Sequence, residues 1–277
     1  MPELPEVETV SLALSKVVNN AKIVKTEIFR NDLRWKIKKS LKKDLQDDFF
    51  KKPFRRGKFI LIPTIRDNIF LIHLGMSGQI KIRDSFETLL KHDHVRITIK
   101  SNNDRIYFIT YNDPRRFGYI DLFNKKEIDQ HFLLKKLGVE PLTKKLNVNY
   151  LEMIFKKKIK CIKDTLMDQG VVAGIGNIYA SEILYSAKIN PYRSVKTLSK
   201  EEIKSIIKAT RQILKKSINL GGTTLQNHLQ PNGKLGYFSQ KLEVYGKKNI
   251  ICKKCKNLIS VSTLSNRSTY FCNNCQI

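Results

Sequence analysis

Apolar residues repeat at helical spacing near the start of the chain and then in short, strand-like runs. The first repeat has intervals of three and four residues, as on one face of a helix, and consists of Val7, Val10, Leu14 and Val17. The later runs are rich in Ile, Val, Phe and Tyr and are bounded by Asp, Asn, Gly or Pro, which is typical of antiparallel strands joined by tight turns. Their spacing predicts a β-sandwich or barrel. The runs cover residues 58–65, 68–82, 94–101 and 105–113.

The second half of the chain has the spacing of helices. From about Lys125 onward, apolar residues recur at intervals of three and four, with a linker expected at 141–149. Ser199 and Glu202 form the Ser-x-x-Glu of a capping box ahead of the longest segment. The sequence therefore predicts an α+β fold in which a β domain precedes a helical domain. Helices are expected within residues 127–142, 150–158, 161–169, 177–187 and 199–220.

The charge balance points to a polyanionic partner. The 277 residues include 52 Lys and Arg against 25 Asp and Glu, a formal net charge of +27. The alternative is a surface coated with lysine that has no such partner. Arginine is more informative than lysine because its planar group binds phosphate through two hydrogen bonds. The pairs Arg55–Arg56 and Arg115–Arg116 lie in turn-like segments, and we expect them to contact the partner.

The sequence predicts no membrane segment. No apolar stretch approaches the ~20 residues that span a bilayer. Acidic residues also occupy the place of the basic region of a signal peptide. We therefore expect a soluble, intracellular protein without a membrane partner.

Four of the five cysteines form two Cys-x2-Cys pairs near the end of the chain. Cys252 and Cys255 are separated from Cys272 and Cys275 by sixteen residues. Four thiolates suit tetrahedral zinc and leave no open position for a substrate, so the spacing predicts one structural Zn²⁺ ion. Four free thiols, or a redox pair, are the alternative.

A glycine-rich turn precedes the helix expected at 177–187. Gly170, Gly174 and Gly176 interrupt the helical pattern. A helix that begins near Asn177 has exposed amides at its start, and these suit a phosphate group. A turn between helices without any ligand is the alternative.

The chain opens with the residues MPELPEVETV. Pro5 suits the first turn of the expected helix because the fixed φ of proline fits there, whereas Pro2 lies ahead of the helix. Removal of an initiator methionine would give Pro2 a free secondary amine, which is an ionisable nucleophile. The alternative is an ordinary proline near a helix start.

These features together resemble the formamidopyrimidine-DNA glycosylase family. The resemblance covers nearly the whole chain in order, and it implies an N-terminal β-sandwich domain over residues 1–135, a helix–two-turn–helix domain over 145–245 and a zinc-finger hairpin over 246–277. The motifs that carry it are PELPEVET (2–9), RRGKF (55–59), HLGMSG (73–78), DPRRFG (113–118), GIGNIYASEIL (174–184), GGTT (221–224), GYF…VYG (236–246) and the terminal cysteines.

The resemblance also implies an activity and a role for each site residue. The activity is that of a bacterial, cytoplasmic base-excision repair enzyme, a glycosylase and AP lyase that acts as a monomer on damaged double-stranded DNA. It removes oxidised purines such as 8-oxoguanine and cuts the strand by β- and δ-elimination. Pro2 would attack the sugar, Glu3 would move protons, Lys58 would bind the phosphate of the lesion, and Glu6 would be a supporting acid. The implied DNA contacts are Met76, Arg115 and Phe117 in the space vacated by the base, and His73, Lys163, Asn177 and Arg267 at phosphates.

The chain departs from the family pattern at two points. Asn266 precedes Arg267 where the family often has glycine, and the segment QNHLQPNGKLG at 226–236 replaces a more usual Arg-Asp. Two alternatives therefore stay open: an endonuclease VIII-type glycosylase for oxidised pyrimidines, and a non-catalytic DNA-binding zinc protein. The opening PELPEVE favours the purine enzyme over the first. Pro2, Glu3 and Lys58 together argue against the second.

Overall fold

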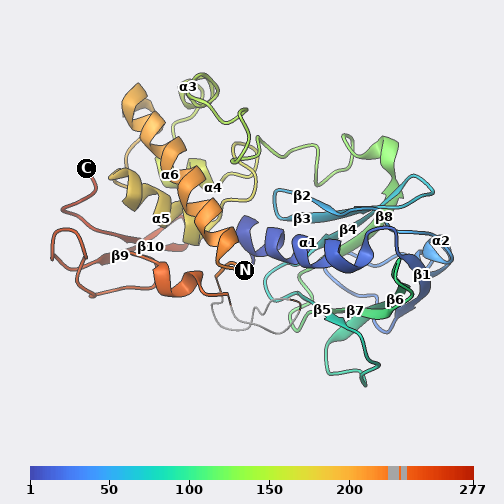
Figure 1. Ribbon diagram of the computed structural model, residues 1–277. Coiled ribbons are helices and arrows are strands. Elements are labelled where there is room, and N and C mark those ends of the chain that lie inside the picture. Colours follow the sequence, from blue (N-terminus) through green and yellow to red (C-terminus); the bar gives the residue numbers. More distant parts are fainter. Residues whose placement is uncertain (224–230, 232–235) are drawn as a thin grey trace. The chain divides into compact units, whose positions relative to one another are not determined.

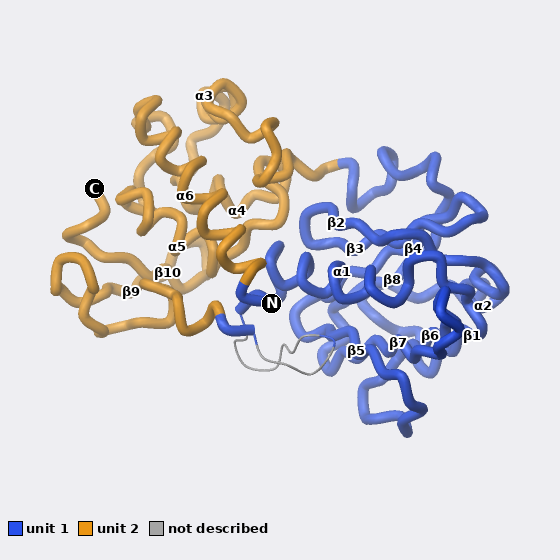
Figure 2. The backbone as a smooth tube through the Cα atoms, viewed as in Figure 1, with its two compact units in different colours: residues 1–135, 220–237 blue, residues 136–219, 238–277 orange. Residues whose placement is uncertain are grey.

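The structure, a computed structural model, describes residues 1–223, 231 and 236–277. Contacts divide the chain into two compact units, which Figure 2 shows in different colours. Unit 1 comprises residues 1–135 and 220–237, and unit 2 comprises residues 136–219 and 238–277. These units differ from the three domains expected from the sequence, whose boundaries stay predictions. Of the divergent segment 226–236, all but Pro231 and Gly236 lie outside the described residues.

Unit 1 is built from two antiparallel four-stranded sheets (Figure 1). The first sheet contains, in order, β1 (Lys22–Ile28), β6 (Asp93–Lys100), β7 (Ile106–Asn112) and β5 (Gln79–Arg83). The second contains, in order, β2 (Phe54–Arg56), β3 (Phe59–Pro63), β4 (Asn68–His73) and β8 (Tyr119–Asn124). The four runs expected to be strands are confirmed, whereas β1, β2 and β8 were not expected.

The two sheets and helix α1 (Leu4–Val18) share one hydrophobic core. Side chains alternate between the faces of a strand, so Ile60 and Ile62 of β3 point into this core, where Ile109 of β7 also lies. The helix contributes Val7 and Val10 to the same cluster, as its spacing predicted. A short helix, α2 (Leu41–Leu45), adds two further leucines. The expected β-sandwich with an N-terminal helix is therefore confirmed.

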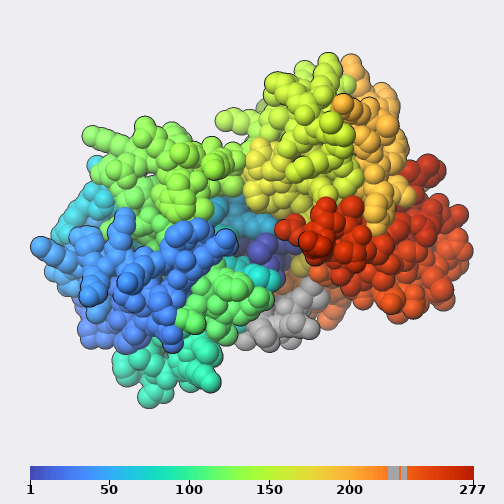
Figure 3. Space-filling view, turned by 180° about the vertical axis from the view of Figure 1, so that it is seen from behind, coloured from blue at the N-terminus to red at the C-terminus, as the bar shows by residue number. Residues whose placement is uncertain are grey.

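Unit 2 consists of helices followed by a β-hairpin. The expected capping box is present, because the N–H of Ser199 donates to Glu202 Oε2 at 2.8 Å and the N–H of Glu202 donates to Ser199 Oγ at 3.2 Å. In the space-filling view of Figure 3, the C-terminal region, in red, lies at the surface of this unit. No helix in the described part of the chain is both long and apolar enough to cross a membrane. The elements are α3 (Val148–Lys156), α4 (Ile162–Met167), α5 (Asn177–Ala187), η2 (Val195–Thr197), α6 (Lys200–Asn219), η3 (Phe238–Lys241), β9 (Ser260–Leu264) and β10 (Arg267–Phe271).

The prediction of a helix over residues 127–142 is wrong. The segment starts at the end of a 3-10 turn, η1 (Lys125–Glu127), and continues in turns. The ring of His131 stacks on that of Phe123 in β8, with 4.4 Å between centroids. Its Nε2 also lies 3.4 Å from Asp121 Oδ2 in the same strand. Contacts with the sheet therefore outweigh the helical spacing of the sequence.

Candidate functional site

The start of the chain is held by the carboxylate of Glu6. Glu3 is the residue before α1, and its N–H donates to Glu6 Oε2 at 2.9 Å. The other oxygen, Oε1, accepts the N–H of Thr223 at 2.7 Å, although 217 positions separate the two residues. Gly222 has a φ of +80°, and a side chain there would meet Glu6 Oε1 at 3.1 Å, so this approach favours glycine. One buried carboxylate thus fixes the backbone that follows Pro2, which is itself buried.

A second set of contacts connects α1 to the turn that carries Lys58. Arg55 Nε donates to Glu8 Oε2 at 2.6 Å, and Arg55 Nη1 donates to the carbonyl of Gly57 at 2.9 Å. Gly57 has a φ of +57°, which the tight turn between β2 and β3 requires. The Arg55 side chain is mostly buried. It was expected at the polyanion surface, but it serves this internal connection and so fixes the turn beside Lys58.

His73 lies beside Lys58 at one end of the second sheet. It pairs with Phe59, the residue after Lys58, and the Phe59 and His73 rings are 4.7 Å apart. Its Nδ1 accepts the N–H of Gly75 at 3.2 Å, so the neutral ring carries its hydrogen on Nε2. Burial, together with the positive charges of Lys58 and Arg34, lowers the pKa of His73 to about 4. The imidazole is therefore a neutral donor at neutral pH.

We expect the His73 ring to stay neutral down to about pH 4, whereas an ordinary histidine has a pKa of 6.5. Between these two pH values the unfolded chain binds more protons than the folded chain, so this group destabilises the fold as the pH falls from 6.5 to about 4. Its contribution to stability is fully present above pH 6.5. An NMR titration of the His73 ring would measure the midpoint, with the urea-unfolded chain as control. A folded-state midpoint above pH 6 would contradict the assignment.

Two loops that join the sheets lie at this same end. Residues 74–78 lead from β4 to β5, and residues 113–118 lead from β7 to β8. In the second sheet His73 pairs with Tyr119, and in the first sheet Gln79 pairs with Asn112. The loops therefore begin and end beside each other. The pairing of the strands brings the predicted site residues of both loops together with Lys58 and His73.

The buried carboxylate of Asp113 ties the two loops to each other. Its Oδ1 accepts the hydroxyl of Ser77 at 2.6 Å, and its Oδ2 accepts the N–H of Gly118 at 2.8 Å. The hydroxyl of Tyr111 also donates to Oδ2, at 3.0 Å. Ser77 Oγ in turn accepts the N–H of Arg115 at 3.1 Å. Several hydrogen bonds to one buried carboxylate give the loops a defined position.

The tied loops present large side chains to the surface. Met76 and Phe117 are 43% and 42% exposed. The guanidinium carbon of Arg115 lies 4.7 Å from the centroid of the Phe117 ring, a cation–π arrangement. Exposed apolar and planar side chains on a fixed support suit stacking against nucleobases.

Two candidate phosphate-binding residues of unit 2, Asn177 and Lys163, converge on the carbonyl of Ser268 in β10. Asn177 Nδ2 donates to it at 2.9 Å from the first turn of α5. Lys163 Nζ lies 3.4 Å from the same carbonyl and donates to Thr269 Oγ1 at 2.7 Å. Lys163 is only 1% exposed, so its ammonium binds the hairpin. Arg267, the residue before Ser268, is exposed.

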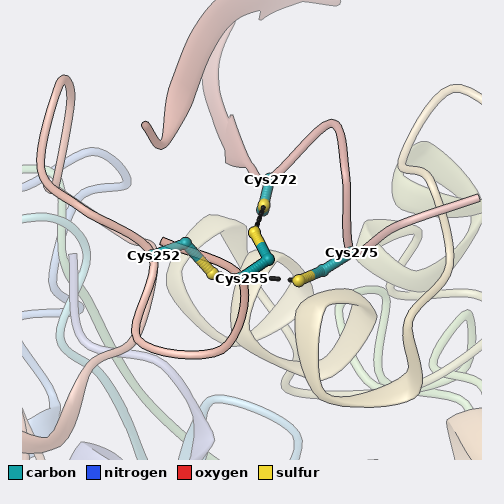
Figure 4. A group of neighbouring side chains, drawn as sticks. All are labelled: Cys252, Cys255, Cys272 and Cys275. Atoms are coloured by element: carbon teal, nitrogen blue, oxygen red, sulfur yellow. Dashed lines mark hydrogen bonds between the residues drawn. The ribbon is translucent and has the colours of Figure 1, made fainter. Parts of the chain in front are cut away.

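The four cysteines near the chain end meet in one cluster (Figure 4). All four Sγ atoms lie within 4.8 Å of one another. The distance is 3.8 Å between Cys252 and Cys275 and 3.3 Å between Cys255 and Cys272. Thiolates placed tetrahedrally about 2.3 Å from a zinc ion would be about 3.8 Å apart. The side chains therefore fit a metal ion with four sulfur ligands.

Comparison with known proteins identifies the family. The sequence model of the formamidopyrimidine-DNA glycosylase N-terminal domain matches residues 1–120, and that of the formamidopyrimidine-DNA glycosylase H2TH domain matches residues 137–228. The chain belongs to the formamidopyrimidine-DNA glycosylase family. The formamidopyrimidine-DNA glycosylase of Zymomonas mobilis is 42% identical over 277 residues, with all of both chains covered.

Solved structures in the formamidopyrimidine-DNA glycosylase family have the same fold. A mutant of the Lactococcus lactis protein in complex with Fapy-dG DNA is 32% identical, with a TM-score of 0.91 and 99% of each chain covered. The wild-type Lactococcus lactis protein in complex with an oxidised-pyrimidine DNA is also 32% identical, with a TM-score of 0.90 and the same coverage. The expected fold class, including the helix–two-turn–helix domain, is thus confirmed.

The predicted site residues fall into two sets, one in each unit, and their roles stay predictions. Sequence reasoning missed the residues that hold these sets in place, among them Ser77, Asp113 and Thr223. All three stand inside motifs of the formamidopyrimidine-DNA glycosylase family, but a motif does not reveal which residues bond to each other. The set in unit 1 is Pro2, Glu3, Glu6, Lys58, His73, Met76, Arg115 and Phe117, and the set in unit 2 is Lys163, Asn177, Arg267 and the four cysteines.

Proposed function

We propose that this protein is a base-excision repair glycosylase and AP lyase that removes oxidised purines from duplex DNA, with Pro2 as nucleophile. The observation that carries the proposal is the buried N-terminal segment, which Glu6 holds through the N–H groups of Glu3 and Thr223. Family membership supports the glycosylase activity. The Fapy-dG DNA bound by the Lactococcus lactis relative supports the purine lesion.

The nucleophile is the secondary amine that Pro2 gains when Met1 is removed. An α-amine has a reference pKa of about 7.7–8.0, so part of it is neutral at pH 7 and can attack C1′ of the damaged nucleoside. The C1′–N bond breaks, the base leaves with a proton, and the opened sugar becomes an iminium on the Pro2 nitrogen. Glu3, the neighbouring carboxylate, carries protons between the sugar oxygen and the leaving base.

The strand is then cut by two eliminations from the iminium. Loss of a proton from C2′ expels the 3′ phosphate, and loss of a proton from C4′ then expels the 5′ phosphate. Water hydrolyses the remaining iminium and releases the Pro2 amine. Lys58, in the turn fixed by Arg55, places its ammonium on the phosphate of the lesion, where it stabilises the departing charge. Glu6 acts by holding the backbone beside the amine.

Met76, Arg115 and Phe117 fill the space that the extruded base leaves in the duplex. Unstacking a base costs a few kcal/mol, which new stacking contacts offset. His73 donates its Nε2–H to a phosphate as a neutral ring, and Asn177 and Arg267 bind phosphates from unit 2. Lys163 supports these contacts by holding the hairpin. The partner is therefore damaged double-stranded DNA.

One structural Zn²⁺ ion is held by Cys252, Cys255, Cys272 and Cys275. When bound, the ion closes the loop that carries Arg267, and it supplies no catalytic chemistry because all four positions are taken by sulfur. We expect the enzyme to act as a monomer in the bacterial cytoplasm.

A lesion panel tests this function against the pyrimidine-specific alternative, which the oxidised-pyrimidine complex of the Lactococcus lactis relative keeps open. The mature protein would be incubated at fixed salt with otherwise identical duplexes that contain 8-oxoguanine, Fapy-dG, an oxidised pyrimidine or no lesion. We expect excision and nicking to be fastest on the two purine lesions. Faster excision of the pyrimidine would reverse the assignment, and binding without nicking of any duplex would support the non-catalytic alternative.

A further inference from the structure

A side chain of helix α5 contacts a sulfur atom of the cysteine cluster. The hydroxyl of Tyr185, near the end of α5, lies 3.2 Å from the Sγ of Cys252. Both side chains are buried, at 2% and 1% exposure. They belong to one small hydrophobic cluster with Val244 and Ile259. The hydroxyl therefore has an apolar environment in which a sulfur atom is its hydrogen-bond partner.

The direction of this hydrogen bond follows from the chemistry of the metal site. A cysteine that binds a metal ion does so as a thiolate and has no proton to give. The tyrosine hydroxyl keeps its proton at neutral pH, so it donates and the sulfur accepts. A hydrogen bond to a charged acceptor is roughly twice as strong as one between neutral groups. In an apolar cluster such a bond also replaces the water that the thiolate cannot reach.

Neighbouring contacts hold the hydroxyl in this position. Glu182, one turn earlier on α5, accepts the N–H groups of residues 243–245 at 2.8–2.9 Å. These three hydrogen bonds fix α5 against residues 243–245, which precede the first cysteine pair. The ammonium of Lys254 lies 4.4 Å from the centroid of the Tyr185 ring and packs on its face. These contacts hold the hydroxyl beside the Cys252 sulfur.

We propose that Tyr185 is a positioning residue for the metal site: its hydroxyl donates to the Cys252 thiolate, orients that ligand and slows release of the ion. The inference rests on the proposed zinc site. Hydrogen-bond partners of metal ligands typically change metal affinity 10–100-fold when they are removed. The same helix begins at Asn177, so α5 connects the cysteine cluster to a candidate phosphate contact.

The variant Tyr185→Phe tests the proposal in the full-length, zinc-loaded protein. It keeps the ring and its packing and removes only the hydroxyl. Tyr179→Phe is the matched control, because Tyr179 lies on the same helix and its buried hydroxyl is 2.6 Å from Ser217 Oγ, outside the cysteine cluster. With a colorimetric chelator in excess, we expect zinc to leave Tyr185→Phe about 10–100-fold faster than wild type, and to leave the control at the wild-type rate.

Cobalt(II) in place of zinc gives a second readout that a purely structural role would not move. Loss of a hydrogen bond raises the energy of the thiolate electrons, so the thiolate-to-cobalt charge-transfer band should shift to longer wavelength in Tyr185→Phe alone. The proposal stands only if both the release rate and the band change in this variant and not in the control. Any other combination overturns it. A wild-type protein that binds neither zinc nor cobalt would overturn the zinc site as well, which distinguishes the two failures.

Discussion

Borohydride is expected to trap a covalent complex between the mature protein and duplex DNA containing 8-oxoguanine. Reduction of the proposed iminium converts it to a stable amine, and peptide mapping should find the DNA on Pro2. A form that keeps an extra residue ahead of Pro2 has an amide nitrogen there, with no basic lone pair. We expect this form to lose trapping and base excision by at least about 10³-fold.

The control for this experiment is Pro5→Ala, which changes a proline in the first turn of α1 that has no free amine. It should still trap on Pro2. Lys58→Ala should also trap on a preformed abasic site, because Lys58 assists the eliminations and does not form the covalent bond. An adduct mapped to Lys58, or full activity with the extended N-terminus, would refute the Pro2 mechanism and leave DNA binding untouched.

Removal of zinc is expected to weaken DNA binding while leaving the β-sandwich folded. Cys272→Ser removes a buried ligand of the cluster. The loop that carries Arg267 then loses its closure, and the Ser268 carbonyl that Lys163 and Asn177 approach is no longer fixed. We expect affinity at fixed salt to fall about 10- to 100-fold, which corresponds to the loss of about one hydrogen bond to a charged group.

Two measurements separate this local effect from general unfolding. Trp35 is the only tryptophan of the chain and lies in unit 1 beside Tyr119, so its fluorescence reports on that unit. The unfolding transition of unit 1, followed by Trp35 fluorescence, should be unchanged in Cys272→Ser. Cys161→Ser is the matched control, since Cys161 stands outside the cluster, and it should keep both zinc and DNA affinity. Undiminished DNA binding after complete zinc removal would show that the hairpin is not part of the interface.

The elements that the sequence predicted correctly are those decided by nearby residues. The strands within 58–65 and 94–101 were recognisable because each is a short run rich in β-branched and aromatic residues between turn-forming residues. The capping box at Ser199 depends on a residue three positions away. The helix predicted over residues 127–142 is absent for the opposite reason. Their helical spacing was outweighed by the packing of His131 on Phe123, and the local sequence does not predict that contact.

The sequence by itself determined the chemistry available to this protein: a proline that can become a terminal amine, four thiols at metal-binding spacing, and a large positive charge. Only the tertiary structure decided which side chains hold these groups in place. Glu6 meets Thr223 across 217 positions, Asp113 meets Ser77 across 36, and Tyr185 meets Cys252 across 67. The physical reason is that hydrogen bonds act over about 3 Å, whereas a sequence records only neighbours along the chain. Which distant carboxylate or hydroxyl arrives within that distance depends on strand pairing and packing, and these form only when the whole chain folds.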